Sequence, residues 1–369
     1  MNDVQVWRDE FPVTRQWAYL DLANKCPLPR AVVEAWHSFL REGHEGEGIK
    51  DTWKAEAEVV RGKVAALLEA SPEEIAFTKN TSEGLNILAN AIPFAAGENV
   101  VVHAREHPNN LYPWLHVARK GVEVRVVNSS NGDIGLEDLV GRMDTCTRVV
   151  AVSWVSYCTG RRMNLWALGQ HCRAHGALLV VDGIQAIGIV DTPVRRLGID
   201  ALACGAHKGL LSTHGVGFLY CRQELLESLR PAYAARASLV SASADSRALS
   251  FASDARRFEI GNANYGGLHA LEAALDLIAR IGVSRIEKRV HHLVGTLMDL
   301  LDRKGIPFVT PRAAEERAGI VAFQVPRPHE VQAALKRHRV VVSVIEGLLR
   351  AAPHFYNTEE ELDHFARLL

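Results

Sequence analysis

The chain has 369 residues, two to three times the length of a typical domain, so one large domain with a smaller one is the default expectation. Hydrophobic residues make up 48% and charged residues 23%, an ordinary balance that excludes general disorder. With 42 Lys and Arg against 43 Asp and Glu, the net charge of -1 favours neither nucleic acid nor an anionic membrane surface as a partner.

Three features of the sequence bear on cellular location. The start, MNDVQVWRDEF, lacks the basic residues and apolar run of a secretory signal. No apolar stretch reaches the roughly 18 residues that a membrane helix needs. The six cysteines are scattered without a CxxC pair, which argues against a disulfide framework or a zinc ribbon. We therefore expect a cytoplasmic protein with no membrane partner.

The first two-thirds of the chain alternate helical and strand patterns. The polar, glycine-rich segment 42–50 predicts a loop, and apolar residues at helical spacing predict helices over 54–69 and 164–175. Six short apolar or β-branched runs predict strands over 74–78, 98–103, 122–127, 148–153, 177–182 and 200–204. Nearly continuous apolar strands that alternate with helices are typical of an α/β fold with a mainly parallel sheet.

The last third has a different pattern. The Ser- and Ala-rich segment 238–256 has no clear period and predicts a long loop near a domain boundary. Beyond it we expect helices over 266–282, 284–303 and 328–337, with strands near 319–324 and 340–345. These elements predict a small α+β domain made of 1–15 and 256–369, beside a large domain over 16–255.

Polar side chains follow two of the predicted strands, and ligands of open α/β sheets bind beyond such strand ends. Asp182 closes an apolar strand, where a carboxylate is costly unless it meets a cation or a strong donor. Lys208 follows another strand in an apolar, glycine-rich segment that lowers a lysine pKa by desolvation. Singly, each has a structural interpretation, as a salt-bridge partner or a snorkelling lysine. Together they match the needs of pyridoxal phosphate, which takes a lysine for its Schiff base and an acid for its ring nitrogen.

The segments VVDGIQAIG (180–188) and CGAHKGLLSTHGVGFLY (204–220) closely resemble class V aminotransferases, a group of fold-type I pyridoxal phosphate enzymes. This group includes cysteine desulfurases, isopenicillin N epimerase-like proteins and kynureninase-like lyases. The resemblance extends from YLDLANKCPLP (19–29) to LRAAPHFYNTEEEL (349–362). It implies a large domain with a mainly parallel seven-stranded sheet, and a smaller α+β C-terminal domain.

The resemblance implies roles at the cofactor ring for five residues. Lys208 would hold pyridoxal phosphate covalently and, once released, move the α-proton. Asp182 would keep the ring nitrogen protonated, and Gln185 would donate to the ring oxygen. His107, in REHPNNLYPW, would stack on the ring. Tyr157 stands where desulfurases have an asparagine near the ring oxygen, so it either donates there or shapes the substrate pocket.

Other residues match the family positions for phosphate and substrate. Thr81 and Ser82 begin a predicted helix, an anion site that is compatible with plain helix capping. His207 would contact the phosphate region or simply pack. Asn262, in RRFEIGNANYGGL, would reach the phosphate of a neighbouring subunit, which implies a homodimer with shared active sites. Arg350 would bind the substrate α-carboxylate.

Two patterns weigh against other assignments. His103, Glu106 and His107 form an HxxEH pattern that binds zinc from one helix in some proteases. Here His103 closes a strand and a proline follows His107, so we expect no such helix and no metal. Gly205 replaces the phosphate-binding serine usual in desulfurases. Gly209 replaces a large residue, which either opens room for a bulkier substrate or is compensated by a neighbour.

The resemblance predicts an enzyme that acts on an α-amino acid through an external aldimine. Transamination, C–S or C–C lysis and epimerisation share that start, and we place aminotransferase first, with a β-lyase or an epimerase as alternatives. A non-catalytic binding protein would be indicated by loss of Lys208, Asp182 or Arg350, and all three are present.

The cysteines bear on the desulfurase alternative. Desulfurases of this family carry a persulfide-forming cysteine shortly before the carboxylate-binding arginine. The stretch 337–350, RHRVVVSVIEGLLR, contains none. We therefore expect no persulfide-forming cysteine in this chain, with Cys26 and Cys158 as the two in loops near the predicted site.

Overall fold

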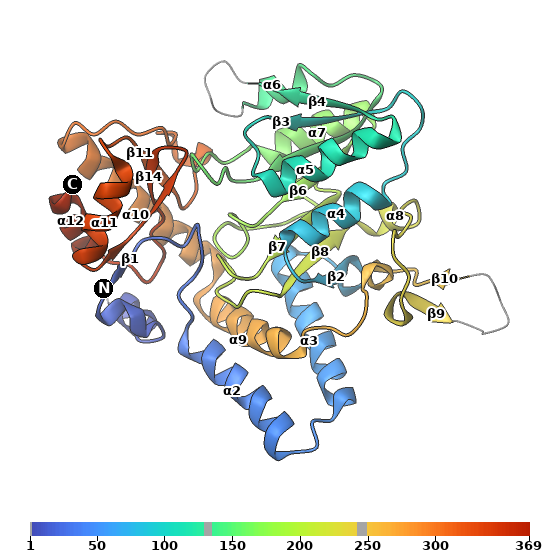
Figure 1. The fold of residues 1–369 in the computed structure, drawn as a ribbon, viewed down its shortest axis with the longest axis horizontal. Coiled ribbons are helices and arrows are strands. Elements are labelled where there is room, and N and C mark those ends of the chain that lie inside the picture. The colour runs from blue at the N-terminus through green and yellow to red at the C-terminus, as the bar shows by residue number, and fades with distance from the viewer. Residues whose placement is uncertain (1, 129–134, 242–248) are drawn as a thin grey trace.

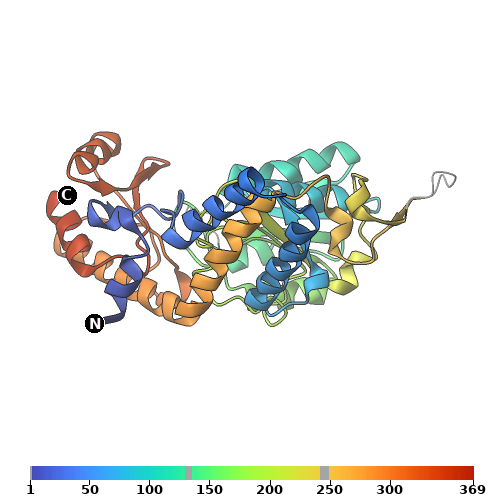
Figure 2. The same cartoon turned by 90° about the horizontal axis from the view of Figure 1, so that it is seen from below.

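The computed structural model describes residues 2–128, 135–241 and 249–369. These residues form two lobes, a larger one built on a seven-stranded sheet and a smaller one that carries both chain ends (Figures 1 and 2). The strands of the large sheet stand in the order β2-β8-β7-β6-β5-β3-β4. They are β2 (Ile75–Thr78), β3 (Asn99–His103), β4 (Glu123–Val127), β5 (Thr147–Ser153), β6 (Leu178–Asp182), β7 (Ala201–Gly205) and β8 (Gly217–Cys221).

The sheet is mainly parallel, as the sequence predicts, and is buried on both faces except at its edge strand β4. Strands β4, β3, β5, β6 and β7 pair in parallel, and β8 and β2 join antiparallel at one edge. Alternate residues of one strand enter different cores: Val100 and Val102 pack on one face and Val101 on the other. Polar side chains are therefore left to the strand ends, where a binding site can form.

Helices cover both faces of the sheet (Figure 1). Helices α4 (Thr81–Ala91) and α5 (Pro108–Val117) pack on one face, and α3 (Lys50–Leu68) and α7 (Leu165–His175) on the other. Helix α9 (Tyr265–Ile281) packs on α2 (Arg30–Glu45) and α3, and α6 (Leu136–Val140) and α8 (Gln223–Leu226) are short. A Cβ at Gly84 would come within 2.7 Å of the Ala203 Cβ, so α4 lies close on β7 and its first turn meets the strand ends.

The smaller lobe contains an antiparallel sheet in the order β11-β14-β13. Its strands are β11 (Val321–Phe323), β13 (Ser343–Ile345) and β14 (Leu348–Ala351), and its helices are α1 (Asn2–Arg8), α10 (Val283–Arg303), α11 (Pro328–Arg337) and α12 (Glu359–Leu368). Strand β1 (Ala18–Tyr19) pairs in parallel with β12 (Val340–Val341). Where one domain ends and the other begins stays a prediction.

Two sequence predictions are wrong, and one strand of the large sheet was not predicted. The segment 42–50 is not one loop, because α2 continues to Glu45 and α3 begins at Lys50. The described parts of 238–256 include a β-ladder of β9 (Leu239–Ser241) with β10 (Ser250–Phe251), while 242–248 lie outside the described residues. Strand β8 was missed because its apolar run is only four residues long and follows the glycine-rich segment at 215–217. Gly217 is needed there, since a Cβ would lie 2.5 Å from the Cys204 carbonyl oxygen.

The helices also bear on the membrane question. Within the described residues, no helix combines the length and apolar character that are needed to cross a bilayer.

Candidate active site

A cavity of about 420 Å³ opens at the carboxyl ends of β5, β6 and β7. Its wall contains most of the side chains that the sequence analysis placed in one site. These are Thr81, Ser82, His107, Tyr157, Asp182, Gln185, His207 and Lys208. The sheet topology therefore brings together these residues, which are up to 127 positions apart in the chain, from Thr81 to Lys208.

Asp182 and Lys208 carry opposite pKa shifts at the base of this cavity. Asp182 ends β6, accepts a hydrogen bond from the Ile184 amide (3.0 Å) and is 3% exposed. Burial raises the pKa of its carboxyl to about 6. Burial also lowers the pKa of the Lys208 amine to about 8, against the attraction of Asp182. The two form no ion pair within the described part of the chain, so each is available to a ligand.

The first turn of α4 forms one end of the cavity. Asn80 caps the helix by accepting a hydrogen bond from the Glu83 amide (2.9 Å). Thr81 Oγ1 accepts a hydrogen bond from the Gly205 amide (2.9 Å), which leaves the hydroxyl proton free to be donated. Ser82 also lines the cavity. First-turn amides and the helix dipole favour an anion here, so capping and anion binding are compatible.

Two histidines lie side by side next to this turn. The rings of His207 and His214 stack with centroids 4.2 Å apart, and burial lowers the pKa of His207 to about 4. A Cβ at Gly205 would lie 3.3 Å from His207 Nδ1, so the His207 ring fills the space that a larger residue 205 would enter. Gln185 lines the cavity and donates its side-chain amide to the Ala23 carbonyl (2.9 Å).

His107 and Tyr157 form the opposite wall. His107 precedes α5 and accepts a hydrogen bond from the Asn109 amide at Nδ1 (3.1 Å). Its proton is therefore assigned to Nε2. Burial, followed by the charges of Lys208 and Arg350, lowers its pKa. The Tyr157 ring meets it edge-on with centroids 4.9 Å apart. A neutral, flat ring thus faces the cavity.

A buried carboxylate beneath this wall was not predicted as a site residue. Glu106 accepts hydrogen bonds from the Ser153 amide (2.7 Å), the Ser153 hydroxyl and the Asn110 side chain (3.0 Å). Burial raises its pKa to about 7. Because Ser153 pairs with Asp182 across β5 and β6, Glu106 fixes the strand ends on which the site is built.

The HxxEH pattern does not form a metal site. His103 lies in β3, Glu106 binds Ser153, and α5 begins only at Pro108. The described His, Cys, Asp and Glu side chains contain no group of three or more that could hold a metal ion.

Arg350 and Asn262 do not line the cavity. Arg350 lies in β14, is 3% exposed, and donates to the Tyr157 carbonyl (2.6 Å) and to the Ser343 hydroxyl (3.0 Å). Arg350 therefore lies behind Tyr157, which lines the cavity. Asn262 accepts a hydrogen bond from Lys50 Nζ (2.6 Å) and lines a separate pocket with Lys79 and Glu83. Its predicted contact with a second subunit stays a prediction.

Several lining residues were missed by the sequence analysis. Ser153 could have been found by the strand-end rule that found Asp182, because it ends β5. The remainder come from the first turn of α5 or from segments outside the helices and strands, and they are Asn24, Asn80, Asn109, Val155, Ile184 and His214.

Gly209 does not open room in the site. A Cβ there would lie 2.3 Å from the Ile187 carbonyl oxygen and 2.9 Å from the Ile189 side chain. Gly188, with a φ of +84°, would place its Cβ 2.3 Å from the Gly209 carbonyl oxygen. Two glycines therefore let the segments after β6 and β7 touch, and Ile189 fills the space.

Replacing Gly209 with alanine is expected to lower the free energy of unfolding by about 1–3 kcal/mol, because the backbone around Ile187 must shift. Urea unfolding measures this change. Gly62→Ala is the matched control: no atom lies within 4 Å of a Cβ there, and the substitution should stabilise α3 by up to ~1 kcal/mol. Equal stability of Gly209→Ala and the wild type would contradict the tight contact.

The cysteines expected near the site are both buried. Cys26 directs its thiol to the Ser212 carbonyl (3.3 Å), and burial raises its pKa to about 12. Burial raises the pKa of Cys158 to about 11. The unreactive thiol is therefore the dominant form of both at neutral pH.

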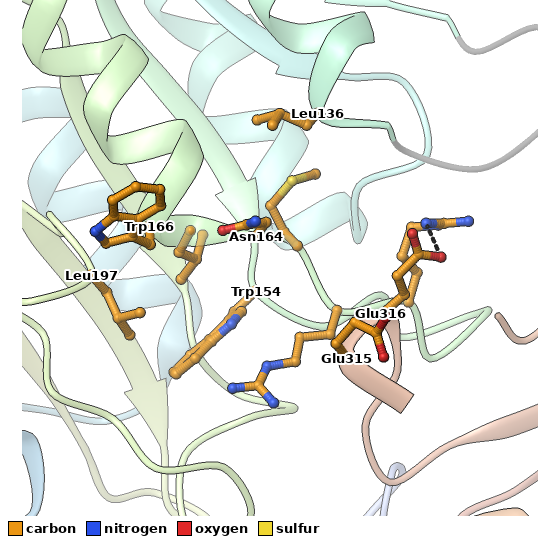
Figure 3. Close-up of a pocket in the computed structure, with 11 residues that line it drawn as sticks. Leu136, Trp154, Asn164, Trp166, Leu197, Glu315 and Glu316 are labelled. Carbon is orange, nitrogen blue, oxygen red and sulfur yellow. Dashed lines mark hydrogen bonds and ion pairs between the residues drawn. The ribbon is translucent and has the colours of Figure 1, made fainter. Parts of the chain in front are cut away.

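A second cavity of about 440 Å³ lies near α6 and α7 (Figure 3). Trp154, Trp166 and Leu197 line one part of it, and Glu316 pairs with Arg161 (3.3 Å) in another. None of the predicted site residues lines it, whereas eight of them line the first cavity.

The sequence profile described as Aminotransferase class-V matches residues 18–365. A probable cysteine desulfurase from Methanothermobacter thermautotrophicus is 32% identical, over 96% of this chain and 94% of that protein. A cysteine desulfurase from Cronobacter sakazakii is 33% identical, over 98% of this chain and 96% of that protein.

Solved structures share the fold. The apo structure of a cysteine desulfurase from Thermococcus onnurineus superposes with a TM-score of 0.92 at 32% identity, over 100% of this chain and 97% of that one. The cystine C–S lyase C-DES, in complex with its reaction product cysteine persulfide, superposes with a TM-score of 0.90 over 97% of this chain and 98% of that one. At 24% identity, the second likeness concerns the fold alone.

Proposed function

This chain belongs to the class-V aminotransferase family, and on that premise we propose that it is a lyase that breaks the Cβ–S bond of a cysteine-type amino acid. The family depends on pyridoxal phosphate, so this is the cofactor, and the protein is an enzyme of the transferase or lyase type. Curated relatives named cysteine desulfurases favour C–S cleavage, our second expectation, over the transamination that we placed first.

The residues present fit pyridoxal phosphate. The α4 turn offers hydroxyls and amides for a phosphate at one end of the cavity. The buried Asp182 carboxylate suits a protonated ring nitrogen, and the unpaired Lys208 amine suits an aldehyde. His107 presents a neutral ring for stacking. The observation that carries the proposal is the meeting of Asp182 and Lys208 in one cavity, without an ion pair between them.

Each residue then has a definite task. Lys208 would hold the cofactor and, when displaced by substrate, accept the α-proton. Its lowered pKa keeps part of the amine unprotonated near neutral pH. Asp182 would retain a proton on the ring nitrogen, and Thr81 and Ser82 would hold the phosphate. Bound there, pyridoxal phosphate supplies an electron sink for the pair left at the α-carbon.

The site supports elimination rather than transfer of sulfur to the protein. The hairpin of β13 and β14 that carries Arg350 contains no cysteine. Elimination breaks the Cα–H and Cβ–S bonds, and water then releases a 2-oxo acid and ammonia. From cysteine, this gives pyruvate, ammonia and sulfide, whereas a desulfurase gives alanine.

An assay of purified protein with cysteine, S-substituted cysteines, alanine and aspartate tests the proposal. Sulfide or thiol, pyruvate, ammonia and alanine are scored separately, with and without an added 2-oxo acid. We expect pyruvate and ammonia in equal amounts from the sulfur-containing substrates without a 2-oxo acid. Amino-group transfer that requires the 2-oxo acid would restore the aminotransferase assignment, and alanine as the product would assign a desulfurase.

Replacing Cys26 or Cys158 with alanine is expected to leave at least half of the sulfide release, because both thiols are buried and protonated. Cys146→Ala, an exposed cysteine just before β5, is the control for the substitution itself. Loss of sulfide release in Cys158→Ala with cofactor still bound would show that the protein carries the sulfur.

Two broader predictions belong to this proposal. A homodimer with shared sites is supported by the position of Asn262, which is exposed and lines a pocket next to the α4 turn, separate from the Lys208 cavity. A cytoplasmic location is supported by the six cysteines, all of which are free.

A further inference from the structure

An ion pair stands at the edge of the proposed active site. Glu346 Oε2 lies 2.5 Å from Arg105 Nη2, and both side chains are 40% exposed. Glu346 Oε1 accepts a hydrogen bond from the Tyr157 hydroxyl (2.7 Å). Because the Tyr157 side chain lines the cavity, the pair lies one side chain away from it, open to solvent.

The backbone at Glu346 is strained. Glu346 and Gly347 form the two-residue turn between β13 and β14, with φ angles of +50° and +79°. Such turns favour Asn-Gly or Asp-Gly, and a longer side chain in the left-handed region is unfavourable. An exposed ion pair contributes little stability in return. The turn itself therefore does not favour a glutamate, and the carboxylate is held at the edge of the cavity by Arg105, the Tyr157 hydroxyl and the Cys158 thiol (3.7 Å).

The pair is also placed at a definite distance from Arg350. Arg350 lies four residues after Glu346 on the same hairpin and donates to the Tyr157 carbonyl (2.6 Å), while the Tyr157 hydroxyl donates to Glu346. One tyrosine residue thus spans the gap between the predicted α-carboxylate site and the ion pair. A second charged group of the substrate, about one tyrosine length from the first, would reach Glu346 and Arg105.

We propose that Arg105 and Glu346 form a distal subsite for a zwitterionic group, so that the preferred substrate is a disulfide or thioether with an α-amino acid at each end. Arg105 takes the distal carboxylate and Glu346 the distal ammonium, which exchanges one internal ion pair for two with the ligand. The inference rests on the proposed lyase function for its reaction.

The reaction of such a disulfide balances without an added oxidant or reductant. In the half held by Arg350, the α-proton passes to the Lys208 amine and the Cβ–S bond breaks with its electron pair on sulfur. Water then converts this half into a 2-oxo acid and ammonia. The distal half leaves with both sulfur atoms as a persulfide, so no cysteine of the protein takes part.

Four disulfides of cysteine, which differ only in the distal half, test the distal carboxylate and the distal ammonium independently. Cystine carries both distal charges, the cysteamine disulfide only the ammonium, the 3-mercaptopropionate disulfide only the carboxylate, and the ethanethiol disulfide neither. Initial rates of 2-oxo acid release are measured on the wild type. Dissociation constants are measured by calorimetry on cofactor-loaded Lys208→Ala protein, which is not expected to turn over. The same probes are applied to Arg105→Met and Glu346→Gln.

We expect Arg105→Met to weaken binding of cystine and of the carboxylate-only disulfide about fivefold, the factor typical of an exposed ion pair. Glu346→Gln should weaken cystine and the ammonium-only disulfide by a similar factor. The neutral disulfide should be unaffected by either. Arg312→Met, which breaks an exposed pair with Asp302 (2.8 Å) elsewhere, should change none of the four. Thermal unfolding shows whether the variants stay folded.

Equal dissociation constants for cystine and the neutral disulfide would overturn the subsite, whether or not 2-oxo acid is formed. Charge-dependent binding without 2-oxo acid release would support the subsite and overturn the lyase function. Glu346→Asn places a residue that this turn favours at position 346 and removes the carboxylate that faces Arg105. It should be at least as stable as the wild type while binding cystine less tightly, and unchanged cystine binding would also overturn the subsite.

Discussion

Replacing Lys208 with alanine is expected to reduce turnover of any amino-acid substrate by at least about 10³-fold, because the chain loses the group that accepts the α-proton. The reason lies in the position of Lys208, where burial lowers the amine pKa to about 8 and no ion pair within the described residues holds it. In the wild type, borohydride reduction followed by peptide mapping should place the cofactor on Lys208.

The control for this experiment is Lys336→Ala, an exposed lysine of α11 that should keep full activity and full labelling. Labelling at another lysine of the wild type would contradict the site assignment. Full turnover by Lys208→Ala would contradict the role in proton transfer.

Removing the Lys208 amine also has a consequence for the stability of the cofactor-free protein, which we expect to see in Lys208→Met. The Lys208 pKa is lowered by folding, so between about pH 8 and pH 10.5 the unfolded chain binds more protons and stability rises with pH. Below pH 8 the amine is charged in both the folded and the unfolded state, and burying that charge lowers the stability of the folded protein. Lys208→Met should therefore be more stable than the wild type at pH 7, on the order of 2 kcal/mol after allowance for partial exposure. The difference in unfolding free energy between Lys208→Met and the wild type should become smaller as the pH approaches 10.5.

The sequence predicted the parts of the site that depend on strand ends. Asp182 and Lys208 follow apolar runs, and parallel strands bring their carboxyl ends to one edge of a sheet, so their meeting could be expected. The seven-stranded sheet itself came from the family resemblance, since glycines obscured β8. Gly217 is required by the close approach of β7, which only the paired strands make visible.

Contacts between distant segments could not be predicted in this way. Arg105 and Glu346 are 241 residues apart, and neither stands in a pattern that points to the other. Glu106 looked like part of a zinc motif, whereas its partner is the end of a strand 47 residues later. The first pair depends on how the smaller lobe meets the large one, and the second on how a loop packs against a strand end. Neither contact leaves a periodic pattern or a residue spacing in the sequence.

Arg350→Lys is expected to lower kcat/KM for the amino-acid substrate roughly 30-fold or more, with cofactor content unchanged, because lysine keeps the charge but cannot make the bidentate pair with the α-carboxylate. The guanidinium is fixed by Nη1 on the Tyr157 carbonyl and Nε on the Ser343 hydroxyl, and Asp21 lies 3.7 Å from Nη2. Remaining N–H groups can meet a carboxylate in a fixed orientation, whereas a lysine ammonium on a shorter stem cannot make these contacts together.

The substitution also breaks internal hydrogen bonds, so a lower rate alone would not separate binding from folding. The ratio of kcat/KM for an S-substituted cysteine to that for its decarboxylated amine does separate them, because the concentration of folded enzyme cancels. The wild type should prefer the amino acid strongly, and Arg350→Lys should lose most of that preference. Arg337→Lys, an exposed residue of α11, should keep it. If Arg350→Lys keeps the full preference, the arginine serves to hold Tyr157 and Ser343, and the α-carboxylate is bound elsewhere.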